Sequence, residues 1–174
     1  MQALQMGVNS EPPAIEVKKL HPIPEIICGV NEDKDKIRDN IGINIKRGLP
    51  QARPYETQWE KTVGLALGGP TLKETFPDLL DRGLTPSGMV MLDSREFNNR
   101  FVYPLVEDCK YFISSQCHPS VFENLKDNKV WIWHCAGDEN FDLLKEVYGE
   151  DYYPVMGGAT IALRAVHMLR MLGF

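Results

Sequence analysis

The sequence predicts an α/β fold of the Rossmann-like, doubly wound type, with a mostly parallel sheet and flanking helices. From Lys61 onward, short apolar runs alternate with longer amphipathic segments. Apolar runs between helices are typical of parallel strands that are covered on both faces. Glycine-rich turns follow the first run and precede the last amphipathic segment. Such turns are common in folds that bind ligands beyond the carboxyl ends of their strands.

The chain divides near residue 60. Residues 1–60 are expected to form an N-terminal arm and a helix that pack on the body, and residues 61–174 to form the Rossmann-like domain. Residues 1–24 are rich in proline and polar residues, which is typical of an extended arm. Residues 50–60 are predicted to be a linker.

One helix is predicted between the arm and the linker. Asn31 is its expected N-cap, and Gly48 with Pro50 is expected to stop it. Isoleucines recur at helical spacing and form its expected buried stripe. They are Ile37, Ile41 and Ile45.

Four strands, each followed by a helix, are predicted in the body. Each strand is a short apolar run, and in each helix apolar residues recur at helical spacing. Pro77 is expected to break or restart the first of these helices, because proline lacks a backbone N–H. The strands are Val63–Leu67, Met89–Leu92, Tyr111–Ser115 and Val130–His134; the helices are Thr71–Arg82, Phe97–Val106, Ser120–Leu125, Phe141–Tyr148 and a last one from near Gly158 through Leu169.

The turn after the first strand has the composition of a phosphate site. Within KTVGLALGGPTL, Gly68 and Gly69 allow a tight turn and the close approach of a ligand. Pro70 suits the first position of a helix, and the helix that begins near Thr71 offers unpaired N–H groups to an anion. The pattern matches neither GxGxxG nor GxxxxGK[ST], so a plain strand-to-helix turn is the alternative interpretation.

A second glycine-led turn opens the last predicted helix. It comprises Gly157, Gly158, Ala159 and Thr160. Together, the two turns are expected to hold two phosphates, or a phosphate and a carboxylate.

Asp93 follows the second strand and is a candidate catalytic residue. It is expected to coordinate Mg²⁺ on a bound nucleotide, or to accept hydrogen bonds from a ribose or substrate hydroxyl. The alternative is a helix N-cap, which aspartate often supplies after a strand. Because the chain has no Walker lysine, the further positive charge would come from Arg95 or Arg164.

The third strand ends in SSQCHP and provides the other candidate catalytic residue, His118. It precedes a proline and is expected to act as a general acid or a phosphate ligand. A surface histidine bonded to a loop carbonyl is the alternative. Ser115 and Gln116 are candidate ligand contacts to a base or ribose, with loop capping as their alternative.

A zinc site is a weaker hypothesis. Cys117-His118 and His134-Cys135 would lie on adjacent strands, but adjacent residues rarely point at one metal. A nucleophilic Cys117 with His134 as its base has no better support. Trp131 and Trp133 share one face of a strand and suit either stacking on a heterocycle or the core.

Several of these segments together resemble the MptE-like family, which is named for the archaeal 6-hydroxymethyl-7,8-dihydropterin diphosphokinase. The resemblance covers about residues 61–174 and depends on the order and spacing of the segments. LALGGPTL is similar to the motif that opens the family's domain, and MVMLD to its next strand and aspartate. YFISSQCHP is similar to the family's third strand end, and GGATIALRAVHMLRMLGF to its late helix.

The resemblance implies a Rossmann-like domain that binds a nucleotide at these loops. For the named enzyme, the reaction is transfer of diphosphate from ATP, with Mg²⁺, to a pterin hydroxymethyl group. Related folds include glycosyltransferases that use CMP-sugars or other nucleotide-activated sugars. We therefore expect a nucleotide-dependent transferase acting on a hydroxyl acceptor; the alternatives are a nucleotide-sugar-dependent glycosyltransferase and a non-catalytic binding module. The implied contacts are Gly68, Gly69, Pro70, Thr71, Asp93, Gln116, Gly158 and Thr160.

The chain departs from the family pattern after Phe174. In the family, leucine-glycine-phenylalanine leads into a further strand with an acidic site residue, whereas this chain ends there. Either that strand is absent by design or the chain is a fragment of a longer reading frame. An uncovered sheet edge or helix surface would favour a homodimer.

Composition excludes several other classes of function. The 174 residues are 43% hydrophobic, enough for a core of ordinary size, and the net charge of −5 argues against binding nucleic acid or membrane surfaces. No apolar stretch approaches the roughly 18 residues that span a bilayer. The cysteines predict reduced thiols in a cytoplasmic protein, because they form no CxxC motif. They are Cys28, Cys109, Cys117 and Cys135.

Overall fold

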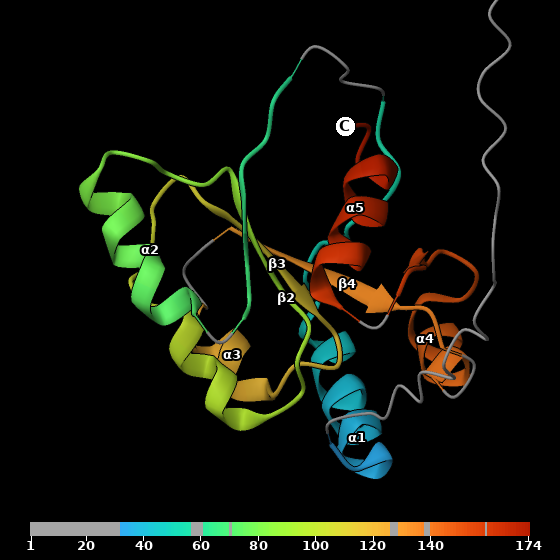
Figure 1. Cartoon of the computed structure of the whole chain (residues 1–174). Helices are drawn as coiled ribbons and strands as arrows, with labels where there is room; N and C mark the ends of the chain where they lie inside the picture. Colours follow the sequence, from blue (N-terminus) through green and yellow to red (C-terminus); the bar gives the residue numbers. More distant parts are fainter. Residues whose placement is uncertain (1–31, 57–60, 70, 126–128, 138–139, 159) are drawn as a thin grey trace, which may run out of the picture.

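A parallel five-stranded sheet forms the centre of the molecule (Figure 1). The computed structural model describes residues 32–56, 61–69, 71–125, 129–137, 140–158 and 160–174. Every pair of neighbouring strands is parallel, which confirms the predicted α/β, Rossmann-like fold class. The strands are β1 (Leu65–Leu67), β2 (Gly88–Met91), β3 (Lys110–Ser114), β4 (Val130–Cys135) and β5 (Pro154–Val155).

Helices cover both faces of this sheet. Alternate residues of a strand point to opposite faces, so Met89 and Met91 face one layer while Val90 faces the other. The first layer contains the core residues of α1, α2, η2, α3 and α4. The second contains Met168, which belongs to α5, and Ala52, which precedes the sheet in the chain. The helices are α1 (Lys34–Asn44), α2 (Leu72–Asp81), α3 (Pro119–Asn124), α4 (Phe141–Tyr148) and α5 (Ile161–Met171), with 3₁₀ turns η1 (Ile45–Arg47) and η2 (Glu96–Val102).

The strand order follows the chain order from β1 to β5. Right-handed crossovers between successive neighbours place their connecting helices on one face, which explains why the first layer is the more populated. Among the described strands, there is no reversal of order of the kind that gives a doubly wound sheet its central crevice. A ligand site must therefore be found along the carboxyl edge itself.

The predicted strands agree with the observed ones to within two residues, and α4 has its predicted bounds. The strand β5 was not predicted, because two residues carry no period. The prediction that Pro77 breaks the helix is wrong, since α2 runs through this exposed residue while Leu72 and Phe76 anchor it in the core. The predicted helix Phe97–Val106 is the shorter 3₁₀ turn η2, in which Asn98 bonds back to the Arg95 carbonyl oxygen through its backbone and side-chain nitrogens.

The N-terminal part differs from the prediction at two points. Asp33 is the N-cap of α1 and accepts from the Asp35 and Lys36 backbone nitrogens, while Asn31 and residues 1–24 lie outside the described residues. The predicted linker, residues 50–60, is wrong at its start, because Gln51 forms a parallel bridge with Ile132, whereas residues 53–56 are exposed and belong to no helix or strand. The Ile132 nitrogen donates to the Pro50 oxygen at 2.9 Å, and this pairing satisfies backbone groups on the edge of β4.

The described helices include none that is long and apolar enough to cross a membrane.

Candidate functional site

The carboxyl ends of β1, β2 and β3 lie side by side at one edge of the sheet, because the strands are parallel neighbours. The turn after β1 is fastened to this edge by a hydrogen bond from the Gly68 nitrogen to the Val90 oxygen at 2.9 Å. Asp93 and Ser94 follow β2. Ser115, Gln116 and His118 follow β3. The structure thus brings the predicted candidates of the first three strand ends together.

The two glycines of the first turn differ in what surrounds them. A Cβ on Gly68 would lie 2.7 Å from the Met91 sulfur, so a larger residue here would require the Met91 side chain to shift. A Cβ on Gly69 would meet only the Leu67 oxygen, at 3.8 Å, and the backbone is not left-handed. The fold therefore does not require a glycine at position 69. Pro70 lies outside the described residues.

Thr71 precedes α2 with its side chain exposed and without a capping hydrogen bond. Its carbonyl accepts from the Glu74 and Thr75 backbone nitrogens at 3.0 Å. The Leu72 nitrogen also donates to the Gly69 oxygen at 3.1 Å. Of the first three N–H groups of α2, which have no partner within a helix, that of Lys73 alone makes no hydrogen bond with the described residues.

Asp93 is engaged by Arg95. The backbone nitrogen and Nε of Arg95 both donate to Asp93 Oδ1 at 3.0 Å, and the second guanidinium nitrogen donates to Oδ2. Hydrogen bonding to Asp93 raises the pKa of Arg95. The Arg95 guanidinium also lies 4.5 Å from the centre of the Phe97 ring. Asp93 is not the N-cap of η2, which is Arg95 and has no side-chain capping bond; its carboxylate accepts the Arg95 backbone N–H and forms an ion pair with the Arg95 side chain.

The ion pair with Arg95 restricts the ability of Asp93 to bind Mg²⁺. The described residues contain no group of three or more His, Cys, Asp or Glu side chains that could hold a metal ion. Mg²⁺ in phosphate sites needs only one or two carboxylates, with water and phosphate oxygens completing the shell. Asp93 fits that role only if Arg95 releases one carboxylate oxygen.

Gln116 and Ser115 contribute to the loop that follows β3. The Gln116 side-chain nitrogen donates to the Leu92 oxygen at 2.9 Å, and the Ser115 backbone nitrogen donates to the Trp133 oxygen at 2.8 Å. Ser115 is buried. The Gln116 bond matches its loop-capping alternative and ties the ends of β2 and β3 together, while the Ser115 bond ties β3 to β4.

Two asparagines of α1, missed from the sequence, hold this helix against the edge. Asn44 is fully buried, and its Nδ2 donates to the carbonyl oxygens of Ser115 and Cys117 at 2.9 and 2.7 Å. Asn40 Nδ2 donates to the Ser94 and Gln116 oxygens, both at 3.1 Å. Their one-turn spacing, beside Ile41 and Ile45, was the available signal.

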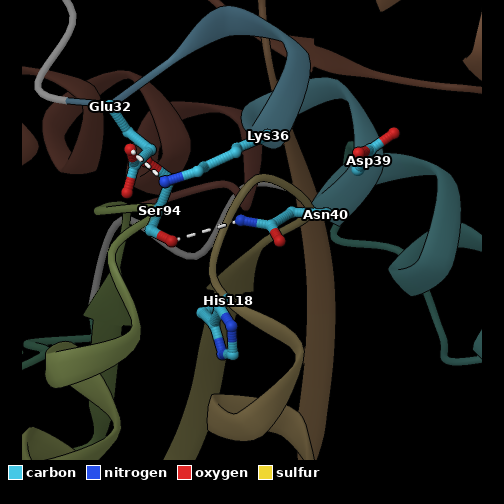
Figure 2. A pocket seen from close by; sticks show the side chains of 6 residues that line it. All are labelled: Glu32, Lys36, Asp39, Asn40, Ser94 and His118. Atoms are coloured by element: carbon cyan, nitrogen blue, oxygen red, sulfur yellow. Dashed lines mark hydrogen bonds and ion pairs between the residues drawn. The ribbon is translucent and has the colours of Figure 1, made fainter.

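A small polar cavity remains between α1 and the ends of β2 and β3 (Figure 2). Its volume of about 180 Å³ is below the range of roughly 300–1,000 Å³ that is usual for sites of drug-sized ligands. His118 contributes to its wall, while His118 Nδ1 caps α3 by accepting from the Ser120 nitrogen. The lining residues are Glu32, Lys36, Asp39, Asn40, Ser94 and His118.

The second glycine turn lies elsewhere on the sheet. β1 and β5 are separated by three strands, so at about 4.8 Å per strand the two turns lie roughly 19 Å apart along the sheet. At this separation the two turns cannot hold neighbouring phosphates of one nucleotide. Gly157 is required by its backbone conformation, with a φ of 136°, whereas a Cβ on Gly158 would lie 2.5 Å from Cδ1 of the exposed Leu163 and would require that side chain to shift.

α5 begins at Ile161, later than predicted, and Thr160 is its N-cap. The Thr160 hydroxyl accepts from the Leu163 nitrogen at 3.4 Å. Arg164 donates to the Val155 oxygen at 3.0 Å and thereby fastens α5 to β5. Ala159 lies outside the described residues.

The structure does not support a nucleophilic Cys117 with His134 as its base. Cys117 is buried, and burial raises its pKa well above the ordinary value, so the thiol stays protonated. His134 is buried on β4 with its ring 5.3 Å from that of Tyr148. Trp133 belongs to the core and donates its indole N–H to the Phe112 oxygen.

Comparisons of the chain with protein-family models, curated proteins and solved structures find no match.

Proposed function

We propose that this chain is a nucleotide-dependent transferase, which binds a phosphorylated nucleotide at the turn after β1 and transfers a phosphate-containing group to a hydroxyl acceptor. The observation that carries the proposal is Gly69. This glycine ends the path of β1 at the carboxyl edge, and neither packing nor backbone conformation requires it. A glycine of this kind leaves the backbone open to close approach by a ligand.

The neighbouring groups suit a phosphate chain. α2, a helix of ten residues, begins beside the turn, and the positive end of its dipole would favour a phosphate there. Arg95 lies at the next strand end and supplies a guanidinium beside Asp93. Mg²⁺ held by Asp93 would neutralise phosphate charge, which is the main requirement of phosphoryl transfer. The resemblance to the MptE-like family suggests ATP as the donor and diphosphate as the transferred group.

Substitution of Gly69 tests the proposal directly. Gly69→Ala is expected to weaken binding of MgATP and Gly69→Val to weaken it at least about tenfold, because a side chain here occupies the space that the phosphates would approach. Calorimetric titration of the full chain measures both. Gly64→Val is the matched control, since a Cβ at this earlier glycine meets nothing within 4 Å.

Binding and turnover assays with ATP and with CMP-sugars as donors separate the remaining alternatives. Unchanged MgATP affinity in both Gly69 variants would remove the turn from the site. Binding and turnover of a CMP-sugar, without turnover of ATP, would favour the glycosyltransferase alternative. Tight nucleotide binding with no product from any donor would favour the binding module.

A further inference from the structure

The cavity beneath α1 has a balanced set of donors and acceptors. It is a hollow open to solvent, lined by Glu32, by residues of the first turns of α1, and by Ser94 and His118 from the loops after β2 and β3 (Figure 2). Ser94 follows β2, and the glycine turn follows β1, which is the neighbour of β2 in the sheet. The cavity therefore lies one or two strand spacings from Gly69, about 5–10 Å along the sheet edge.

In its neutral form, His118 can act toward this cavity only as a donor. Its Nδ1 lies 2.8 Å from the Ser120 hydroxyl and accepts from the Ser120 backbone N–H at 3.3 Å. A ring nitrogen that accepts a backbone N–H carries no proton, so the proton of the neutral ring resides on Nε2. Nε2 has no partner among the described residues, and it is the nitrogen left for a ligand.

Ser94 and Asn40 add one hydroxyl and one carbonyl. The Asn40 side-chain nitrogen is used by the Ser94 and Gln116 carbonyls, which leaves its Oδ1 as an acceptor. The Ser94 hydroxyl makes no hydrogen bond with the residues that the structure describes, although Ser94 is buried. Both roles of a ligand hydroxyl, donor and acceptor, are therefore matched here.

The charges around the cavity disfavour an anion. Lys36 is paired with Glu32 at 3.4 Å, which leaves the Asp39 carboxylate as the net charge of the lining. Asp39 makes no ion pair within the described part of the chain. A phosphate placed beside this carboxylate would be repelled, whereas a hydroxyl or an amine would be attracted.

We propose that this cavity is the acceptor site of the transferase: it binds a small, uncharged, hydroxyl-bearing molecule through His118 Nε2–H, Ser94 and Asp39. The assignment to an acceptor rests on the proposed function, but the binding chemistry does not. A cavity of about 180 Å³ equals about six waters at roughly 30 Å³ each, which is enough for a short polyol or a single sugar ring. It is too small for the nucleotide, so donor and acceptor occupy different parts of the edge.

Titration of ¹⁵N-labelled full-length chain with neutral probes tests the acceptor site. Glycerol and D-ribose, added up to about 100 mM to reveal millimolar affinity, are expected to shift the His118 imidazole signals saturably. The free protein should show the proton of the neutral ring on Nε2. Inorganic phosphate at matched ionic strength is expected to give no saturable shift. Asp39→Asn should weaken probe binding several-fold, and Asp35→Asn, on the same helix but outside the cavity lining, should not.

Each contrary result has a distinct meaning. Saturable binding of phosphate without binding of either neutral probe would overturn the acceptor site and make the cavity an anion site. A proton on Nδ1, or no saturable shift with either neutral probe, would also overturn it. The proposed function is tested by a different variant, because MgATP binding is expected to depend on Gly69 and to be unchanged in Asp39→Asn. Probe binding should likewise be unchanged in Gly69→Val.

Discussion

Replacing Asn44 by aspartate is expected to destabilise the folded chain by about 4 kcal/mol. The substitution preserves size but exchanges the Nδ2 donor for an oxygen that faces the carbonyls of Ser115 and Cys117 at 2.9 and 2.7 Å. Each buried carbonyl left without a donor costs about 1–3 kcal/mol, and the new carboxylate is itself buried. Arg47, whose Nε donates to Asn44 Oδ1 at 3.1 Å, offsets only part of this.

Urea denaturation monitored by tryptophan fluorescence measures the loss. Asn40→Asp is the matched comparison, because it makes the same change one turn earlier, where both bonds are 3.1 Å and the residue lies nearer the surface. A smaller loss of about 2 kcal/mol is expected there. Equal losses at the two positions, or a loss below about 1 kcal/mol at Asn44, would show that the asparagines do not hold α1 in place.

The sequence predicts those parts of the fold that local pattern controls. Apolar runs and their flanking glycines and prolines locate β1 to β4, and the spacing of apolar residues locates α1, α4 and α5. β5 has two residues and forms only because the edge of β4 offers it partners. The bridge at Gln51 likewise depends on β4 and has no local signal. Strand order is a property of long-range pairing, and no local period encodes it.

The sequence predicts the part of the candidate site that the strand ends form, but not the part that α1 contributes. Parallel strands bring their carboxyl ends together, so the sequence is sufficient to place Asp93, Gln116 and His118 at one edge. It is not sufficient to show that α1 lies across that edge, because this requires the docking of a helix that precedes the whole sheet. Hence the roles of Asn40 and Asn44, and the cavity that Asn40 lines, emerge only from the structure.

Acid is expected to destabilise the protein through His134, by about 3 kcal/mol between pH 6.5 and pH 4 at roughly 1.4 kcal/mol per pKa unit. The side chain is 1% exposed, and neither ring nitrogen has a hydrogen-bond partner among the described residues. Burial lowers its pKa to about 4. In the unfolded chain the ring binds a proton below about pH 6.5, while the folded chain stays neutral, so the unfolded state is favoured increasingly until the folded pKa is reached.

Free energies of unfolding, measured by urea titration at intervals from pH 8 to pH 3 (about the working range of the method), test this dependence. His134→Phe should abolish the loss between pH 6.5 and pH 4, since no ring remains to titrate. Ile132→Val is the matched control: it alters a buried residue two positions earlier on the same face of β4, and should lower stability equally at every pH while keeping the slope.

Asp142, whose pKa is lowered to about 2 by hydrogen bonding to Arg38, stabilises the fold above its ordinary pKa and loses that contribution only as the pH falls further toward 2. The two groups therefore act in separate windows, and an unchanged slope above pH 4 in His134→Phe would rule out the buried ring as its source.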